Sequence, residues 1–388
     1  MKGWKQKTIE KCFKVKSGDF LPKNKMLSIG NIDVYGGNGV VGKHDKYNLT
    51  GENIIIGRVG AKCGNINRVK DNIWITDNAF YISEFTEEFD LKFLEYLLKT
   101  RNLRKTANQA AQPVISYQTI KDIILVIPPL PEQKQIVAIL DEAFEGIDAA
   151  IANTEKNLAN ARELFESYLN GVFTQKGEGW VEKTLQEVCS ITSNLVDPRT
   201  PEFLDLPHIG AGNIISLTGE LKEVKTAREE GLKSGKYTFN ESMVLYSKIR
   251  PYLMKVCRPE LEGICSADVY PLLPKEEELS RNYLFYLLIS QDFTQYAISG
   301  SDRAGMPKVN RDHLFRYRIS LPSLSKQVML AKKLDDMAIE TQRLESIYQR
   351  KLEALKELKQ SILEKAFTGE LTSDTAKEVT DTSKEIAA

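Results

Sequence analysis

A long proline-free stretch with regularly spaced apolar residues constrains the fold of this chain more than any other feature. After Pro128, Pro129 and Pro131, no further proline occurs up to Phe173. Proline fits the first turn of a helix but not its interior, so we expect a helix that begins near Glu132. At 1.5 Å per residue, its ~42 residues span about 63 Å, a length typical of a coiled coil. One stripe of this helix carries apolar or small residues at spacings of three and four: Ile136, Leu140, Ala143, Ile147, Ile151, Thr154, Leu158, Ala161, Phe165, Tyr168 and Val172.

The same stretch occurs a second time, 194 residues later. When residues 128–174 are aligned with residues 322–368 without a gap, 12 of the 47 positions are identical. Solenoid repeats are only roughly 20 to 50 residues long, so this distance indicates two whole domains, each followed by its own helix. Two such helices can bury their stripes against each other. The identical pairs include Pro128/Pro322, Leu130/Leu324, Gln133/Gln327, Leu140/Leu334, Asp141/Asp335, Glu163/Glu357, Leu164/Leu358, Phe173/Phe367 and Thr174/Thr368.

The segment before the first helix has the pattern of a mixed α/β domain. Short β-branched and aromatic runs separated by Gly and Asn predict strands at 54–56, 73–75, 79–82 and 123–127. An apolar face predicts a helix from Leu91 to Leu103. Residues 93–98 match residues 283–288 at a constant offset of 190, so the second domain should share the fold of the first and differ in its loops.

Charge is balanced overall but unevenly distributed. Lys plus Arg and Asp plus Glu both number 53. Residues 1–127 hold 20 basic and 13 acidic residues, whereas residues 180–321 hold 18 and 19. The first domain is therefore the better candidate for contact with a polyanion.

The cysteines and the apolar runs indicate in which cellular compartment the protein resides. The 5 cysteines form no C-x-x-C pair and no cluster with histidine, which favours reduced, packed thiols over disulfides or a zinc site. No apolar run reaches the roughly 18 residues that a membrane span needs, and no signal peptide is recognisable. We therefore expect a cytoplasmic protein that does not interact with membranes.

No catalytic motif is recognisable. The chain has neither a G-x-x-x-x-G-K-[ST] phosphate loop nor a G-x-G-x-x-G after a strand, and it lacks G-x-S-x-G and H-E-x-x-H. Its 3 histidines leave little for a histidine-based site, and each is more often a surface or turn residue. These absences favour a binding protein over an enzyme, with no catalytic residues and no metal ligands.

Polar, glycine-rich segments on both domains are the candidate binding surface. The first domain has a glycine-rich loop at 35–44 and basic or amide residues after the strand at 54–56. The run 247–255 occupies the corresponding place in the second domain. Arg, Lys and Asn can bridge phosphates or bond guanine and adenine edges, although any single one is more often a solvated surface residue.

The chain resembles the specificity subunit of type I restriction-modification systems. The resemblance covers about residues 1–371 and is carried by these segments: Ile127-Pro128-Pro129-Leu130-Pro131-Glu132-Gln133 at the head of the central helix, its echo Leu321-Pro322-Ser323-Leu324-Ser325-Lys326-Gln327, the run Lys248-Ile249-Arg250-Pro251-Tyr252-Leu253, and Ala366-Phe367-Thr368-Gly369-Glu370-Leu371. The second heading departs from the family pattern, because Ser325-Lys326 replaces the usual Pro-Glu.

The resemblance implies an α+β fold with a specific domain order. Two similar mixed α/β target-recognition domains are each followed by a long helix, and the helices pack as an antiparallel coiled coil with pseudo-twofold symmetry. The expected parts are a first target-recognition domain at 1–127, the central helix at 128–175, a second target-recognition domain at 176–321, the C-terminal helix at 322–370 and a disordered tail at 371–388.

The resemblance also implies the function and the partners. Each domain would read one half of a split, asymmetric sequence in double-stranded DNA, and the helices would dock two methyltransferase subunits and the restriction subunits. S-adenosylmethionine, ATP and Mg would belong to those partners, with no cofactor on this chain, and the complex would associate with the nucleoid. The expected DNA-binding residues are Lys43, Arg58, Lys62, Asn65, Gln112, Ser116, Arg199, Asn213, Lys248, Arg250, Tyr252, Lys255, Arg303 and Lys308.

One alternative fits the same repeats. A two-domain coiled-coil scaffold that joins proteins without touching DNA is consistent with the nearly balanced charge of residues 180–321. The excess positive charge of residues 1–127 favours DNA. A nuclease or methyltransferase is disfavoured by the missing motifs.

Overall fold

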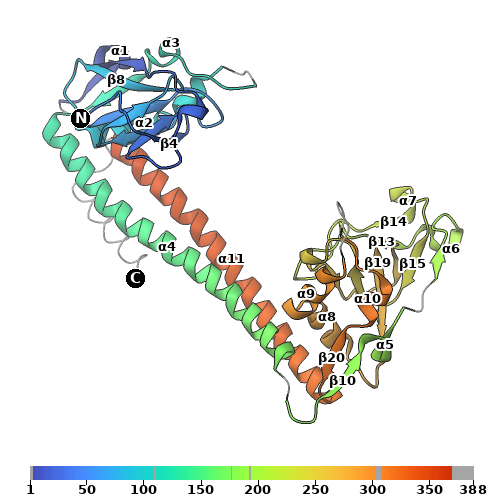
Figure 1. Ribbon diagram of the computed structural model, residues 1–388. Helices are drawn as coiled ribbons and strands as arrows, with labels where there is room; N and C mark the ends of the chain where they lie inside the picture. The colour runs from blue at the N-terminus through green and yellow to red at the C-terminus, as the bar shows by residue number, and fades with distance from the viewer. Residues whose placement is uncertain (1–2, 109–110, 176, 192–193, 302–306, 369–388) are drawn as a thin grey trace. The chain divides into compact units, whose positions relative to one another are not determined.

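Two compact units make up the chain. The computed structural model describes residues 3–108, 111–175, 177–191, 194–301 and 307–368, so the expected C-terminal tail lies outside the described residues. Unit 1 comprises Met1–Glu155 with Arg350–Ala388, and unit 2 comprises Lys156–Gln349. The long helices α4 (Leu130–Thr174) and α11 (Leu324–Thr368) each contribute to both units (Figure 1).

Small β-sheets form the body of unit 1. β1 (Lys5–Thr8) pairs antiparallel with β9 (Ile124–Ile127). A second sheet has the order β2-β8-β5-β6, and a third has the order β4-β3-β7, with β3 and β7 parallel. The remaining bounds are β2 (Phe13–Ser17), β3 (Ile32–Gly36), β4 (Gly39–His44), β5 (Asn53–Gly57), β6 (Ile66–Val69), β7 (Ile73–Ile75), β8 (Ala79–Phe85), α1 (Ile9–Cys12), α2 (Leu91–Thr100) and α3 (Tyr117–Ile120).

Unit 2 repeats this pairing scheme. β10 pairs with β20 as β1 does with β9, and the order β11-β19-β16-β17 corresponds to β2-β8-β5-β6. The third sheet, β12-β15-β18-β13-β14, keeps a parallel pair (β13 and β18) and adds β12 and β15. The bounds are β10 (Val181–Thr184), β11 (Cys189–Ser190), β12 (Leu195–Val196), β13 (Pro207–Ile209), β14 (Lys225–Thr226), β15 (Lys236–Phe239), β16 (Val244–Ser247), β17 (Val256–Cys257), β18 (Gly263–Ser266), β19 (Val269–Pro274), β20 (Arg318–Leu321), α5 (Leu185–Val188), α6 (Pro201–Leu204), α7 (Ala227–Glu230), α8 (Arg281–Ile289), α9 (Gln291–Ser299) and α10 (Arg311–Phe315).

The predicted strands of the first domain are confirmed, and one helix is shorter than predicted. The runs at 54–56, 73–75 and 79–82 fall in β5, β7 and β8, and the run at 123–127 falls in β9 except for Ile123. The helix predicted from Leu91 to Leu103 ends at Thr100, because Asn102 takes a left-handed conformation with φ 44° and a separate 3₁₀ turn follows. Its predicted apolar face is buried, at Phe93, Leu94, Leu97 and Leu98.

The apolar stripe of the central helix is confirmed along its whole length. Each predicted position from Ile136 to Val172 is buried or half-buried, whereas Leu164, which lies off the stripe, is exposed. The helix begins at Leu130 rather than near Glu132, because Pro131 fits the first turn and the Glu132 N–H donates to the Pro129 carbonyl at 2.9 Å. Within the described residues, no helix combines the length and the apolar character needed to cross a membrane.

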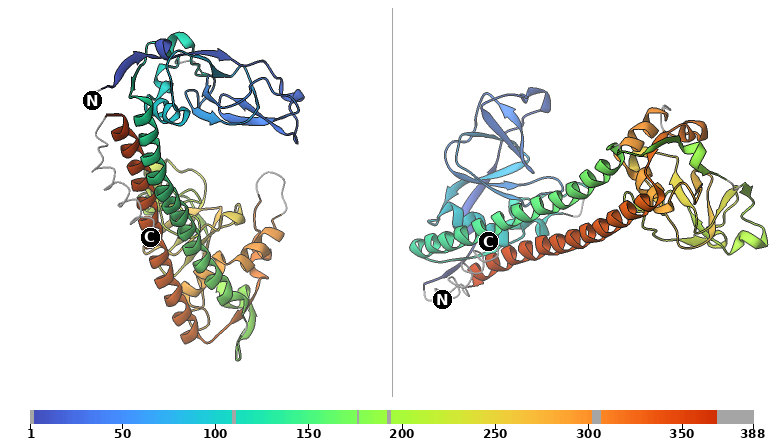
Figure 2. Two further views of the ribbon diagram at one scale, coloured as in Figure 1. Left: turned by 90° about the vertical axis from the view of Figure 1, so that its left-hand side faces the viewer. Right: turned by 90° about the horizontal axis from the view of Figure 1, so that it is seen from below.

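The two long helices pack against each other in both units (Figure 1, Figure 2). In unit 2, Arg162 of α4 pairs with Glu345 at 2.5 Å, and the Lys333 ammonium lies 4.5 Å from the centroid of the Tyr168 ring. Residue numbers rise along one helix as they fall along the other, so the pairing is antiparallel. In unit 1, apolar side chains of both helices pack in the hydrophobic core of the domain. They are Ile136, Leu140, Ala143, Ile147, Leu355, Ile362 and Phe367.

A buried glutamine lies in the first turn of each long helix. Its hydrogen bonds explain why Gln133 and Gln327 are identical in the two repeats. The Gln133 amide accepts the Asp90 N–H at 2.9 Å and donates to the Pro128 carbonyl at 3.0 Å. The Gln327 amide accepts the Ser280 N–H at 2.9 Å and donates to the Pro322 carbonyl at 3.0 Å. Each glutamine thus joins its helix to the turn that precedes the domain's own helix, α2 or α8.

Substituting this glutamine should destabilise unit 1. Gln133→Leu keeps most of the side-chain volume but leaves the Asp90 N–H and the Pro128 carbonyl without their partner, which should cost about 3 kcal/mol. We expect a lower urea midpoint for Gln133→Leu than for the wild type. Gln135→Leu is the matched control, because Gln135 is exposed on the same helix. Equal midpoints for the two variants would contradict the assigned role.

A repeated aspartate makes a second joint between domain and helix. The Tyr96 hydroxyl donates to Asp141 at 2.8 Å, and the Tyr286 hydroxyl donates to Asp335 at 2.7 Å. Burial, with the hydrogen bond to Asp141, raises the pKa of Tyr96 well above its ordinary value. The cation beside the aspartate differs, since Lys92 contacts Asp141 whereas Arg258 contacts Asp335.

Candidate nucleic-acid interface

Each unit carries the same loop directly after the central strand of its four-stranded sheet. Loop 58–65 follows β5, and loop 248–255 follows β16. The Gly57 N–H donates to the Asn65 carbonyl at 2.8 Å, and the Ser247 N–H donates to the Lys255 carbonyl at 3.0 Å. These equivalent bonds close both loops at the offset of 190 residues seen in the sequence.

A segment from much later in each domain is bonded to this loop. In unit 1, the Gly60 N–H donates to the Pro113 carbonyl at 2.9 Å. In unit 2, the Arg250 N–H donates to the Pro307 carbonyl, also at 2.9 Å. An isolated bridge follows in each unit, Val59 with Val114 and Ile249 with Lys308. The loop and the later segment therefore form one surface in each unit.

The equivalent loops differ at their two left-handed positions. In unit 1 these positions are Gly60, with φ 99°, and Gly64, with φ 84°. In unit 2 they are Arg250, with φ 49°, and Met254, with φ 46°. A left-handed conformation costs a residue with a side chain about 1 kcal/mol, so the arginine is held in a strained backbone.

The loop predicted at 35–44 is instead a hairpin, because residues up to Gly36 belong to β3 and residues from Gly39 belong to β4. Its turn lies against loop 58–65. A Cβ added to Gly37 would meet the Val59 carbonyl oxygen at 2.3 Å, and one added to Gly57 would meet the Gly37 carbonyl oxygen at 2.2 Å. Only glycine permits this approach of two backbones. The turn between β3 and β4 and the loop after β5 therefore contribute to the same surface of unit 1.

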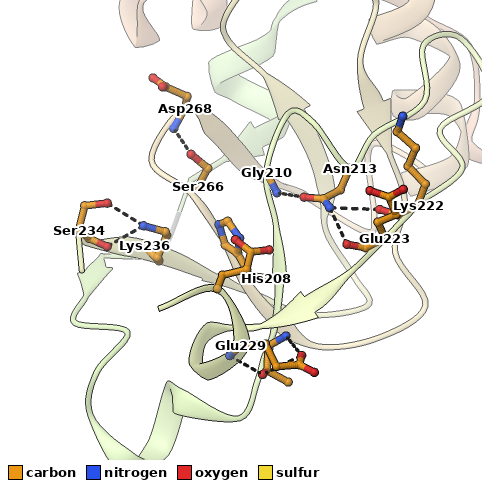
Figure 3. A network of polar contacts seen from close by, with 12 residues as sticks. His208, Gly210, Asn213, Lys222, Glu223, Glu229, Ser234, Lys236, Ser266 and Asp268 are labelled. Carbon is orange, nitrogen blue, oxygen red and sulfur yellow. Dashed lines mark hydrogen bonds and ion pairs between the residues drawn. The ribbon is translucent and has the colours of Figure 1, made fainter. Parts of the chain in front are cut away.

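A polar turn takes the equivalent place in unit 2 (Figure 3). The Asn213 side chain accepts the Gly210 N–H at 2.8 Å and donates to the carbonyls of Lys222 and Glu223, each at 3.1 Å. The Lys255 ammonium donates to the Ala211 carbonyl at 2.5 Å. The turn 210–213 is thus joined both to loop 248–255 and to the segment around Lys222.

Three titratable groups of unit 2, Cys189, Cys257 and His208, are buried. Burial raises the pKa of the Cys257 thiol to about 12 and that of Cys189 to about 12, so both thiols stay protonated near neutral pH. The buried His208 bonds Glu230 at 2.9 Å, and burial lowers its pKa. Among the described residues, no three His, Cys, Asp or Glu side chains gather as metal ligands.

Comparison with known proteins identifies the family. The family model of the type I restriction modification DNA specificity domain matches residues 1–160 and again residues 177–354. The chain belongs to this family. The specificity subunit of the type I restriction enzyme EcoDI from Escherichia coli is 28% identical over 335 residues, which cover 76% of this chain and 74% of that protein. The MjaVIII specificity subunit from Methanocaldococcus jannaschii is 25% identical over 343 residues, covering 80% and 77%.

Solved structures show the same fold. A chain from work on complex assembly and conformational transition of the type I R-M system has a TM-score of 0.72 at 18% identity, covering 95% of this chain and 98% of that chain. The HsdS subunit from Thermoanaerobacter tengcongensis has a TM-score of 0.55 at 19% identity, with the same coverage. The predicted fold class, two similar mixed domains with two long helices, is that of the specificity family.

Two of the predicted binding residues occupy equivalent positions at the base of the loops. The Arg58 guanidinium donates to the Asp77 carbonyl at 3.2 Å and lies 5.3 Å from the Phe80 ring centroid. The Lys248 ammonium donates to the Ala267 carbonyl at 2.7 Å and lies 5.1 Å from the Tyr270 ring centroid. Both cations brace the loop onto the turn before β8 or β19.

The other predicted residues are either exposed at the loops or bonded to neighbouring residues. Lys62, Asn65, Gln112, Arg250 and Tyr252 are exposed on or beside the loops. The remaining predicted residues have partners: Lys43 with Asp33 at 2.6 Å, Arg199 with Asp197 at 2.7 Å, Lys308 with Asp268 at 3.2 Å, and Ser116, whose hydroxyl accepts the Thr119 N–H at 3.3 Å. Arg303 lies outside the described residues.

Lys222, which is not among the predicted residues, lies at the same turn. This exposed lysine is held beside the turn 210–213 because the Asn213 side chain bonds its carbonyl and its N–H donates to the Asn213 carbonyl at 2.9 Å. Asn213 therefore positions Lys222, and its own amide hydrogen-bonds within the protein. An asparagine in a glycine-rich turn was the available signal, but the sequence does not show which distant backbone it bonds.

Proposed function

We propose that this chain is the DNA-reading subunit of a type I restriction-modification complex and recognises a bipartite, asymmetric target. The observation that carries the proposal is the duplicated loop, which is closed and joined to a later segment by equivalent backbone bonds in both units but carries different side chains. Lys62 and Tyr252 hold the same place in the two loops, as do Asn65 and Lys255. Two equivalent scaffolds with different polar side chains would read two different half-sites, since bases are distinguished by side-chain bonds to their edges.

The loops have the composition expected of a DNA surface. Lys, Arg and Asn side chains and close glycine backbones can contact phosphates and base edges. The excess of basic residues in 1–127 supports attraction to a polyanion. Tyr252, 52% exposed, adds an aromatic face beside Arg250.

We infer that methyltransferase and restriction subunits dock on the helices and supply the chemistry. A cavity of ≈ 820 Å³ in unit 2 lies between the helices and the domain, and it is lined by Phe165, Leu169, Leu217, Ile289 and Ile339 among others. Ile339 is 62% exposed there, and apolar side chains from a partner could fill such a cavity. On this proposal S-adenosylmethionine, ATP and Mg act on the partners, and the chain itself makes and breaks no bonds.

Deleting the gene tests the proposal. We expect DNA methylation to disappear from one bipartite, asymmetric sequence across the host genome, and to return when the full-length chain is supplied from a plasmid. Sequencing that detects methylated bases gives the result directly. Unchanged methylation in the deletion strain, while the methyltransferase partner is present, would refute the proposed function. A complemented strain carrying the Gln135→Leu chain is the control for expression.

A further inference from the structure

The segments that meet at the polar turn of unit 2 carry three basic residues, Lys222, Arg250 and Lys255. We propose that Lys222, Arg250 and Lys255 together bind one backbone phosphate of the DNA, so that this cluster anchors the second half-site without reading its sequence. The inference rests on the proposed function and deepens it. It assigns Lys222 to the interface and gives Arg250 and Lys255 a phosphate rather than a base as ligand.

Backbone and side-chain bonds of the turn bring together the segments that carry the three residues. Lys255 reaches the turn through its bond to the Ala211 carbonyl. Figure 3 shows that the Asn213 side chain bonds the backbone of Lys222 at the other end of the turn. Arg250 lies in loop 248–255, which Lys255 closes. Gly212, between these anchors, is exposed, and a Cβ placed there would meet no atom within 4 Å, so the turn leaves room for a ligand.

The electrostatics of the cluster favour an anion. Burial lowers the pKa of Lys255, and the positive charges of Lys222 and Arg250 lower it further. Among the described residues, neither Lys222 nor Arg250 forms an ion pair, and the nearby Glu220 accepts a bond from the Gln342 amide at 3.0 Å. Glu223, which follows Lys222 in the chain, is exposed and forms no ion pair with the three cations among the described residues. Three like charges repel each other, and a phosphate oxygen placed among them would relieve this repulsion.

The left-handed backbone of Arg250 also supports the proposal. The equivalent position in unit 1 is Gly60, which takes the left-handed conformation without strain, yet unit 2 places an exposed arginine there. Strain that persists at a surface position suggests that the side chain is used. Unit 1 also has Asn65 in the place of Lys255, so its loop lacks two of the three cations.

A phosphate anchor suits a domain whose net charge is close to zero. Residues 180–321 hold 18 basic and 19 acidic residues, so general attraction to DNA is weak. A local cluster compensates for this at one point and sets the register of the loop on the duplex. The exposed Tyr252, two residues after Arg250, is then left to contact a base or a sugar.

The test replaces the cluster with the residues of the first unit. Arg250→Gly and Lys255→Asn copy Gly60 and Asn65 into an equivalent loop, so the backbone should be retained, and Lys222→Gln removes the third charge. Lys233→Gln, an exposed lysine of the same unit, is the matched control. The full-length chain, co-purified with its methyltransferase partner, is titrated with a duplex of the methylated sequence and with a scrambled duplex at salt concentrations from about 50 to 200 mM.

Removing a cation that neutralises a phosphate has a distinct signature. Each cluster variant should weaken binding of both duplexes by the same factor, and the slope of log affinity against log salt should become shallower by about 0.9 for each phosphate that is no longer neutralised. Slopes equal to that of Lys233→Gln would overturn the proposal, and so would weaker binding of the target duplex alone, which indicates base reading. If the wild-type complex itself does not prefer its target, the proposed function fails instead.

Discussion

Exchanging residues 1–127 for the corresponding domain of another family member is expected to change one half of the methylated sequence and leave the other half unaltered. The reason is that each candidate DNA-binding loop is built from its own unit. Loop 58–65, the turn at Gly37 and the segment at Pro113 all belong to unit 1, as do the residues that they bond in the contacts described above. Methylation mapping of a host that carries the hybrid chain measures the outcome.

The junction decides whether the hybrid folds. Domain and helix are joined through Gln133, which bonds Asp90, and through Asp141, which bonds Tyr96 and Lys92. A donor domain should therefore supply a tyrosine at position 96 and a hydrogen-bonding cation at position 92. The reciprocal exchange of residues 180–321 is the control, and it should change only the other half. A hybrid that alters both halves would show that the two units do not read independently.

The features that the sequence predicted well are local or repeated. The helix stripe follows from a spacing of three and four residues, and its burial is confirmed from Ile136 to Val172. The duplication at an offset of 190 predicted equivalent places for 58–65 and 248–255, and the backbone bonds of the two loops confirm it. Periodicity and repeats survive in a single sequence because they need no knowledge of distant contacts.

The details that the sequence did not predict depend on contacts between distant segments. Arg58 and Lys248 are residue types that often bind DNA. In the structure, however, their cationic groups donate to carbonyls in the turn before β8 or β19. The hydrogen bond from the Asn213 side chain to the Lys222 carbonyl connects residues on either side of an irregular loop. The extra strands β12 and β15 are short and lack a clear alternating pattern, so tertiary pairing rather than local propensity forms them.

Inserting four residues into α4 after Asn157 is expected to abolish methylation of the wild-type sequence. An insert such as Ala-Glu-Ala-Lys rotates the following part of the helix by about 40° and advances it by about 6 Å. Residues before the insert pack on α11 through contacts such as Asp148 with Lys359, and residues after it through Arg162 with Glu345. Because α11 runs through both sets of contacts without a break, α4 cannot satisfy both after the insertion. Thermal unfolding of the purified complex and methylation mapping would record the effect.

A second insertion separates the effect on stability from the effect on spacing. The same four residues placed in α11 after Gln349 lie opposite the first insert, since Asp148 and Arg162 face Lys359 and Glu345 on either side of that point. With both inserts the two stripes shift together, so packing and thermal stability should recover. The distance between the reading loops should then increase by about 6 Å, which corresponds to about two base pairs at 3.4 Å each. We expect a methylated sequence with unchanged halves and a longer gap. Recovered stability with the original gap would refute the idea that helix length sets the spacing, whereas stability that stays low would contradict the antiparallel register on which the paired insertion depends.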